Sequence, residues 1–222
     1  TEYSPYITLS QMLLDNLLNL NGGLRMANSD KFGTQWIPQF GFSLNPGLGW
    51  TVKGNLAMGY RNPSFRELYL YRMANPDLQP EKMMNYEVSL AKSFSQYFSA
   101  ELTAYYSKGD NLIQQVDMKN QNTLAFINKG LELSAHSHPL DNLWLMATYS
   151  YLHTSLADLV GAPVNQYYLG AEWKPWRFLN IGADLKGIGG LYVTQGIKHQ
   201  NYALFNLKVT WDLCRYLSVF TR

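Results

Sequence analysis

Apolar and polar residues alternate one by one through many separate segments of this chain, and no other feature constrains its fold as strongly. In residues 98–106, for example, the even positions hold Phe, Ala, Leu, Ala and Tyr, while the odd positions include Ser, Glu and Thr. Successive side chains of a β-strand point to opposite faces, so this alternation predicts strands with one apolar and one polar face. We therefore predict an all-β protein.

The pattern predicts about twelve strands, and they share one character. One face is aliphatic with an aromatic residue near an end, and the opposite face is polar. The predicted strands lie at residues 3–14, 16–28, 35–46, 50–60, 83–94, 97–108, 122–137, 142–153, 164–174, 177–189, 201–212 and 216–222. An aliphatic face bounded by aromatics is typical of strands that contact lipid, and the polar face would line a lumen.

The connections between these segments are alternately short and long. The short ones fall near residues 15–16, 46–49, 95–96, 139–142, 175–176 and 213–215, and the long ones at 29–34, 61–82, 109–121, 154–163 and 190–200. Outer-membrane barrels have short periplasmic turns and long extracellular loops. A soluble β-sandwich has no reason to keep all its long loops at one end. The alternation therefore favours a meandering, antiparallel transmembrane β-barrel.

Composition agrees with a membrane barrel and argues against other classes. Aromatic residues make up 14% of the chain and charged residues only 15%, against about 25% charged residues in soluble domains. No stretch approaches the roughly 18 apolar residues of a membrane-spanning helix. The formal net charge of +2 gives no support to nucleic-acid binding, which would favour a basic stripe. Cys214 is the only cysteine, so no disulfide can form within the chain.

One long loop and the strand after it carry an ordered set of residues. The loop contains Gly59-Tyr-Arg-Asn-Pro-Ser-Phe-Arg-Glu-Leu-Tyr69 and Asn75-Pro-Asp-Leu-Gln-Pro-Glu81, and Tyr86-Glu87 follows in the strand. Length, order and spacing resemble the arginine-proline and Asn-Pro-x-Leu boxes of TonB-dependent outer-membrane receptors. The matching positions are Arg61, Pro63, Glu67, Leu68, Asn75, Pro76, Leu78, Pro80, Glu81, Tyr86 and Glu87. Weaker similarities extend the resemblance over nearly the whole chain.

The resemblance implies a place for this chain in a larger barrel. Receptors of this family close with about 22 strands around a plugged lumen. Twelve strands would leave two unpaired sheet edges in hydrocarbon. We therefore expect residues 1–222 to be the C-terminal portion of a receptor barrel, present as a fragment. The plug domain, the TonB box and any signal peptide would lie upstream, and the final hairpin downstream. The expected location is the outer membrane of a Gram-negative cell, in contact with lipid.

The resemblance also implies a function. Such receptors bind a scarce, bulky nutrient at the cell surface and import it when TonB pulls on the plug. The expected ligand is a ferric siderophore or other iron complex, or cobalamin, and TonB would act through the absent plug. The alternative is a passive porin-like or adhesin barrel without energy coupling.

Ligand contacts are expected on the long loops. The candidates are Arg66, Tyr69, Tyr71 and Arg72 in the 61–82 loop, with Tyr192 and His199 in the 190–200 loop. Guanidinium groups pair with oxygen anions, and phenols add flat contact area. A structural role stays equally open, because loop aromatics often pack on one another. No histidine lies between residues 64 and 74, which disfavours haem as the ligand.

No residue pattern indicates catalysis or a resident cofactor. His153 and Ser155 lie on a long loop, but no acidic partner completes a catalytic set. An outer-membrane hydrolase that uses Ser155 is the third hypothesis. His136 and His138 would share one face of a strand, yet no third metal ligand is evident nearby. We expect neither an enzyme, nor a metal site, nor a cofactor.

Overall fold

The structure is a computed structural model that describes residues 1–222 except 123–124, 158, 195–196, 198–199 and 222. Almost all of its regular structure is β. The strands are β1 (Glu2–Tyr3), β2 (Tyr6–Leu13), β3 (Leu18–Ser29), β4 (Gly33–Gly47), β5 (Trp50–Arg61), β6 (Glu81–Ser95), β7 (Phe98–Asp110), β8 (Ile113–Val116), β9 (Lys119–Asn122), β10 (Phe126–Leu140), β11 (Leu143–Thr154), β12 (Asn165–Trp176), β13 (Leu179–Leu191), β14 (Gln200–Cys214) and β15 (Leu217–Thr221). One short helix, α1 (Phe65–Tyr69), lies between β5 and β6. No helix among the described residues is long and apolar enough to cross a membrane.

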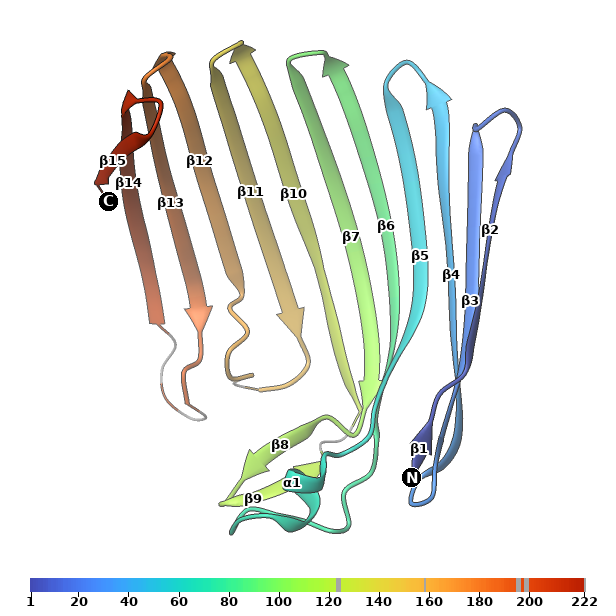
Figure 1. Ribbon diagram of the computed structural model, residues 1–222. Coiled ribbons are helices and arrows are strands. Elements are labelled where there is room, and N and C mark those ends of the chain that lie inside the picture. The colour runs from blue at the N-terminus through green and yellow to red at the C-terminus, as the bar shows by residue number, and fades with distance from the viewer. Residues whose placement is uncertain (123–124, 158, 195–196, 198–199, 222) are drawn as a thin grey trace.

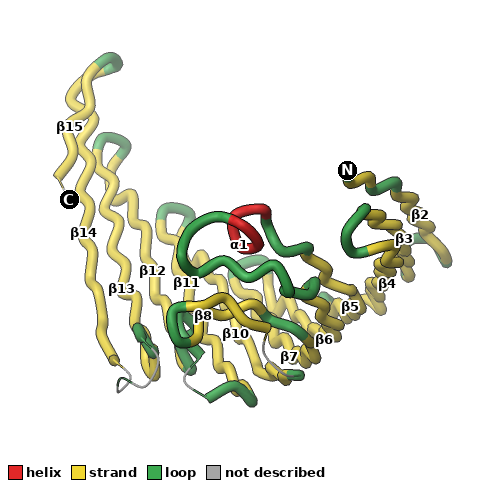
Figure 2. The backbone as a smooth tube through the Cα atoms, turned by 90° about the horizontal axis from the view of Figure 1, so that it is seen from below, coloured by secondary structure: helices red, strands yellow, loops and turns green. Residues whose placement is uncertain are grey.

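The strands form one curved antiparallel sheet (Figure 1). From β3 to β15 each long strand pairs with the next one along the chain, while β1 and β2 both pair with β3. The small β8–β9 hairpin is inserted between β7 and β10 and forms a separate two-stranded sheet. Figure 2 shows the large sheet as an open arc with a concave and a convex side. The predicted meander is therefore confirmed.

All twelve predicted strands are present, and the short turns alternate with longer loops as predicted, except at the connection between β3 and β4. Two predicted segments differ in detail. The 3–14 segment is divided into β1 and β2 at Pro5, because proline has no backbone N–H to donate to a ladder. The 29–34 connection, predicted to be long, is a tight turn of three residues between Ser29 and Gly33.

Two elements were missed by the sequence reasoning, and both lie in the long loops. The β8–β9 hairpin turns at Asp117 and Met118, whose φ angles are 48° and 62°. Positive φ at both central residues is the geometry of a two-residue hairpin turn, but that geometry usually calls for Asn-Gly or Asp-Gly. The polar sequence of β9 also gives no alternation of apolar and polar residues. The helix did have a signal, since Ser64 and Glu67 form a capping box.

The two faces of the sheet differ as predicted. Polar side chains bond between strands on one face. Lys53 of β5 reaches over β6 to lie 3.2 Å from the Glu101 carboxylate of β7, and Ser89 Oγ lies 2.8 Å from Thr103 Oγ1 on the neighbouring strand. In the pairing of β5 with β6, Arg61 is on the same face as Lys53. Because Arg61 binds a loop that covers the concave side (Figure 2), the polar face is the concave one. This matches a lumen wall.

The opposite face is apolar and exposed. Leu102, Leu133, Leu169 and Leu207 each leave 47–50% of their surface uncovered. Such a continuous apolar face is expected to be covered, here by lipid. Aromatic side chains bound it near the short turns, where the Phe178 ring lies 6.2 Å from the Trp211 ring, and near the long loops at Tyr86, Tyr106, Tyr149 and Tyr167. These are the two interfacial girdles of a barrel.

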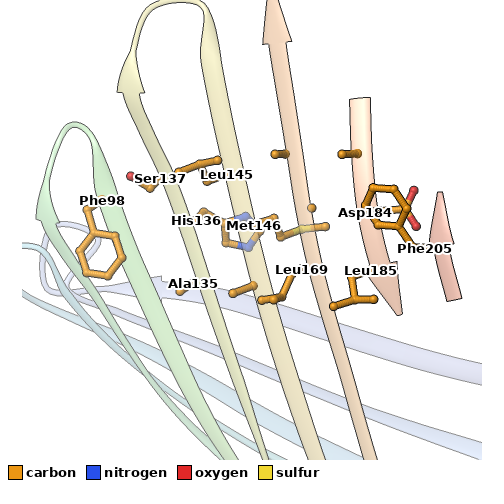
Figure 3. A pocket seen from close by; sticks show the side chains of 14 residues that line it. Phe98, Ala135, His136, Ser137, Leu145, Met146, Leu169, Asp184, Leu185 and Phe205 are labelled. Carbon is orange, nitrogen blue, oxygen red and sulfur yellow. The ribbon is translucent and has the colours of Figure 1, made fainter. Parts of the chain in front are cut away.

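A shallow depression of about 490 Å³ is lined by β10 to β14 and by Phe98 of β7, towards the short-turn end of the strands (Figure 3). Its lining includes small residues on neighbouring strands, between larger aliphatic and aromatic side chains. They include Ala135, Ala147, Ala171, Leu145, Leu169 and Phe205. Its mostly apolar lining and its distance along the strands from the long loops separate it from the predicted ligand contacts.

Candidate functional site: the loop between β5 and β6

The loop of residues 62–80 joins β5 to β6 and is hereafter called the β5–β6 loop. It contains α1 and folds back over the concave side of the sheet, beside the β8–β9 hairpin (Figure 2). Figure 1 shows it at the same end of the strands as the β11–β12 loop (residues 155–164). Most of the residues that resemble the receptor boxes lie in this loop or at its two ends.

Arg61 ties the two ends of the β5–β6 loop together. Its Nε and Nη2 donate to the two oxygens of Glu81 at 2.7 and 2.8 Å. Its Nη1 donates to Glu67 Oε2 at 3.0 Å. Glu81 also accepts from the backbone N–H of Ile113 at 2.8 Å, which connects the loop to the β8–β9 hairpin. A bidentate arginine–carboxylate pair is stronger and more directional than a single charged contact. The Arg61–Glu81 pair therefore holds the two ends of the loop together, and we call it the base of the loop.

Glu67 joins this base to the helix. Its carboxylate accepts from the backbone N–H of Ser64 at 2.7 Å, and its own N–H donates to Ser64 Oγ at 3.3 Å. These reciprocal bonds satisfy N–H groups that the first turn of a helix leaves unpaired. Burial raises the pKa of the Glu67 carboxyl, but the hydrogen bonds from Arg61 and Ser64 outweigh it and place the pKa below its ordinary value. Glu67 is thus held as a carboxylate.

Asparagine side chains connect the β5–β6 loop to β9. Asn75 Nδ2 donates to the backbone oxygen of Asn120 at 2.8 Å, and the Asn120 N–H donates to the backbone oxygen of Met73 at 2.8 Å. Further along, Asn122 and Gln79 exchange two hydrogen bonds, at 2.8 and 3.0 Å. Side-chain amides can satisfy loop backbone groups in this way because each carries both donors and an acceptor. The loop and the hairpin consequently form one hydrogen-bonded unit.

A small apolar core lies under these polar ties. Leu78 is only 1% exposed and Leu68 5%, and Pro63 and Pro80 are also buried. Pro76 is exposed. The two remaining box positions, Tyr86 and Glu87, lie outside the loop. Tyr86 is exposed in β6 with its ring 6.2 Å from that of Tyr106, and Glu87 is the next residue, on the opposite, concave face. Most box residues therefore build the loop itself.

The predicted contact residues of this loop lie on its exposed surface. Tyr69 is 50% exposed and Tyr71 70%, and Arg66 and Arg72 are exposed as well. The guanidinium carbon of Arg66 lies 4.9 Å from the centre of the Tyr71 ring. The structure thus brings Arg66 and Tyr71 together, and Tyr69 is on the same short helix as Arg66.

The β13–β14 loop (residues 192–199) holds the two other candidates, and the structure places only Tyr192. Tyr192 forms an isolated parallel bridge with Val160, and its backbone oxygen accepts from the Gly161 N–H at 3.0 Å. It therefore belongs to the contact between the β11–β12 and β13–β14 loops rather than to the surface of α1. His199 lies outside the residues that the structure describes.

Sequence reasoning missed two residues that belong to the α1 surface. Lys31, on the turn between β3 and β4, donates from Nζ to Tyr69 Oη at 3.0 Å and to the Pro76 backbone oxygen at 2.7 Å. Phe65 packs its ring 5.3 Å from that of Tyr69. Phe65 lies within the recognised segment and its helical spacing to Tyr69 could have indicated the contact. Lys31 is far from Tyr69 in the sequence, and no local sequence pattern indicates that the two residues are in contact.

Ser155, weighed as a catalytic nucleophile, bonds to the backbone of a neighbouring strand. Ser155 Oγ accepts from the backbone N–H of Ile127 at 2.8 Å, and the Ser155 N–H donates to the Ile127 oxygen at 2.8 Å. This is a structural tie of the β11–β12 loop to β10. Across the described ranges, no cluster of three or more His, Cys, Asp or Glu side chains is arranged to hold a metal ion.

Comparison with known proteins decides the family. Residues 1–221 match the family described as TonB dependent receptor-like, beta-barrel. The chain belongs to the TonB-dependent receptor family. It is 27% identical over 216 residues to the vitamin B12 transporter BtuB of Photobacterium profundum, which covers 89% of this chain and 35% of that protein. It is 30% identical over 223 residues to an iron-regulated outer membrane virulence protein of Vibrio cholerae, covering 96% of this chain and 32% of that protein.

Solved structures support the same fold. The siderophore receptor PirA from Pseudomonas aeruginosa matches with a TM-score of 0.80 at 21% identity, over 99% of this chain and 41% of that one. The copper transporter OprC matches with a TM-score of 0.77 at 16% identity, over 96% of this chain and 41% of that one. The chain therefore spans about a third of the length of its curated relatives. It is a stretch of a Gram-negative outer-membrane β-barrel from a family of receptors and transporters.

Proposed function

We propose that this chain is the C-terminal, loop-bearing portion of a receptor barrel that binds and imports an iron complex. In this proposal the exposed surface of α1 and Tyr71 contacts the ligand at the extracellular end. The plug, the contact with TonB and the remaining strands belong to parts of the receptor outside this chain. One observation carries the proposal. Hydrogen bonds of Arg61 hold the base of the loop, and the loop presents arginine and tyrosine side chains on its exposed surface.

The backbone at Tyr71 supports a binding role. Its φ of 72° is in the left-handed region, which costs an L-residue roughly 1–2 kcal/mol. Burial of the side chain does not offset this cost, since Tyr71 is 70% exposed. Sparsely populated backbone conformations occur in turns and also cluster at ligand-binding sites. The geometry places the phenol beside the Arg66 guanidinium, and both groups can hydrogen-bond the oxygen atoms of a chelate.

Relatives suggest which ligands to test. The names of similar proteins refer to iron regulation, siderophores, vitamin B12 and copper. Cobalamin is the second candidate because BtuB of Photobacterium profundum is a vitamin B12 transporter. Arginine and tyrosine on the loop surface favour an oxygen-rich iron chelate over it. A passive barrel gains no support from any of these relatives.

The test uses the complete receptor in detergent and in cells. Binding of ferric chelates and of cobalamin is measured by fluorescence quenching, and uptake is compared with and without a functional TonB system. The double variant Arg66→Gln/Tyr71→Ala should weaken binding of the ferric chelate about tenfold or more, since central aromatic and arginine contacts dominate binding. Arg177→Gln, on the short turn between β12 and β13, is the matched control and should leave binding unchanged.

Two results would count against this proposal. Equal affinity of the double variant and the wild type would remove α1 and Tyr71 from the binding surface. Uptake that proceeds without TonB would indicate a passive barrel.

A further inference from the structure

Two cation–phenol pairs are adjacent on the β5–β6 loop. The Arg66 guanidinium carbon is 4.9 Å from the ring centre of Tyr71, and Lys31 Nζ is 4.9 Å from the ring centre of Tyr69. The two tyrosines are separated by a single residue, and their cations come from different parts of the chain. Cations are attracted to the negative face of aromatic rings. Tyr71 therefore holds Arg66 beside its ring, whereas Tyr69 holds Lys31 mainly through its hydroxyl, since Nζ lies 3.0 Å from Oη and 4.9 Å from the ring centre.

Both cations have unused capacity. The Lys31 ammonium has three donors, of which Tyr69 Oη and the Pro76 backbone oxygen accept two. In the described part of the chain, no carboxylate lies within salt-bridge distance of Lys31 or Arg66. The contrast with Arg61 is direct, because Glu67 and Glu81 both bind that arginine instead. The acidic groups at the loop base are thus engaged there, and no described carboxylate pairs with the positive charge of Lys31 or Arg66.

We propose that Lys31 and Arg66 form a two-cation clamp that selects chelates of net negative charge over neutral ones. This inference rests on the proposed function and adds a specificity-determining residue, Lys31, from the neighbouring β3–β4 turn. Anionic oxygens of the chelate would take the free donors of both cations, and the rings of Tyr69 and Tyr71 would flank them. A neutral chelate of similar size gains no such charge interaction.

The clamp also explains why Lys31 reaches across to another loop. Its contact with the Pro76 oxygen holds the ammonium over the β5–β6 loop rather than in bulk solvent. A cation held in position before binding loses less side-chain entropy on complex formation. Electrostatic complementarity of this kind acts mainly on specificity and on the rate of association, and it weakens with salt.

The experiment compares two probes on the complete receptor in detergent. One is the ferric complex of a tris-catecholate, which is an anion, and the other is the ferric complex of a linear trihydroxamate, which is close to neutral. Affinities are measured by fluorescence quenching at low and high salt. The wild type should bind the anionic probe about tenfold more tightly or better, and the preference should shrink with salt.

Variants at Lys31 separate charge from structure. Lys31→Gln should lower the affinity for the anionic probe about five- to tenfold and leave the neutral probe unchanged. Lys31→Arg keeps the charge and should retain most of the preference. Lys31→Gln/Arg66→Gln should abolish it. Hydrogen exchange of the Asn120 amide, which is bonded to Met73, should be unaltered in Lys31→Gln and so report an intact loop.

The outcomes distinguish the clamp from the proposed function. Equal affinities of the wild type for the two ferric probes would overturn the clamp and leave the iron-receptor proposal in place. A loss in Lys31→Gln of the same factor for both probes would also overturn it, by showing a purely structural role. Binding of cobalamin with neither ferric probe bound would overturn both proposals.

Discussion

The β5–β6 loop and the contact between the β11–β12 and β13–β14 loops lie at the same end of the sheet but are built differently. The first has an apolar core, with Leu78 and Leu68 almost fully buried, and a base of charge-assisted hydrogen bonds at Arg61. The second is joined through backbone contacts, and its apolar side chains Val160 and Val193 are 48% and 54% exposed. The first region is folded around its own buried residues, whereas Val160 and Val193 at the second contact stay half exposed.

The difference indicates where a binding surface can be ready before the ligand arrives. Side chains on a region with a buried core keep their positions, which reduces the entropy lost on binding. Regions with few buried apolar contacts open at low free-energy cost. The α1 surface belongs to the first kind. The comparison therefore predicts that substitutions inside the β5–β6 loop destabilise it locally, whereas similar substitutions in the β11–β12 loop have small effects.

Leu78→Ala should have the largest effect. The side chain is 1% exposed, and removing such a buried aliphatic group costs about 2–5 kcal/mol through lost burial and the cavity left behind. Hydrogen exchange of residues 62–80 in the complete receptor should accelerate strongly, while the strands of the barrel stay protected. Val160→Ala, at a half-exposed site, is the matched control. It should change the free energy of local opening, measured by hydrogen exchange, by less than about 0.5 kcal/mol. Similar effects of the two variants would remove the distinction between the loops.

Arg61→Met should be the next most severe change. It leaves the carboxylates of Glu67 and Glu81 facing each other without a cation, and truncating one partner of a charged hydrogen-bond network costs about 1.5–3 kcal/mol. We expect the lower part of that range, since the Arg61 side chain is 47% exposed. Limited proteolysis of the complete receptor should show new cleavage within residues 62–80.

Lys53→Met is the control for Arg61→Met. It removes a cation that pairs with Glu101 on the wall of the sheet, below the loop. It should produce no new cleavage in residues 62–80. Cleavage there in Lys53→Met but not in Arg61→Met would show that the wall, rather than the loop base, holds the loop in place.

Much of the strand order could be predicted from the sequence, because alternation reports which face of a strand each residue occupies. The long strands from β3 to β14 agree with the predicted segments to within a few residues. The predictions failed where the alternation is absent. In the β8–β9 hairpin, β9 is polar, and the turn residues Asp117 and Met118 are not the Asn-Gly or Asp-Gly pair that usually indicates a tight turn. The sequence therefore indicates only a long connection at residues 109–121, where the structure has a hairpin.

The candidate site shows the same division. Arg66, Tyr69 and Tyr71 could be chosen from the sequence because they lie in a recognisable segment. Lys31 could not, since it is 38 residues from Tyr69 along the chain and meets it only when two loops converge. Long-range contacts between loops depend on how far each loop folds over the sheet. A single sequence has no periodic pattern that indicates how far a loop folds.

The smallest predicted effect is the change of hydrogen-exchange protection with pH. It should differ between the β5–β6 loop and the β11–β12 loop. The Glu67 carboxyl has a pKa below its ordinary value of 4.5 because the Arg61 and Ser64 hydrogen bonds outweigh burial, which raises it. A group whose pKa is lower in the folded state stabilises that state above its unfolded pKa, and the stabilisation is lost as the pH falls through the folded pKa. The β5–β6 loop should thus be unaffected between pH 7 and about pH 5 and lose protection below about pH 4.5. Hydrogen exchange, corrected for the intrinsic pH dependence of amide exchange, measures this.

Glu67→Gln provides the comparison for the pH experiment. The amide cannot change its charge, so the loop should be weaker at neutral pH and its protection should vary less with pH below about 4.5. Glu81 also binds Arg61, so a residual pH dependence should remain in this variant. The β11–β12 loop serves as an internal reference, because its tie through Ser155 and Ile127 involves no ionisable group. An equal loss of protection in both loops on acidification would assign the effect to the barrel as a whole, and would contradict a local role for Glu67.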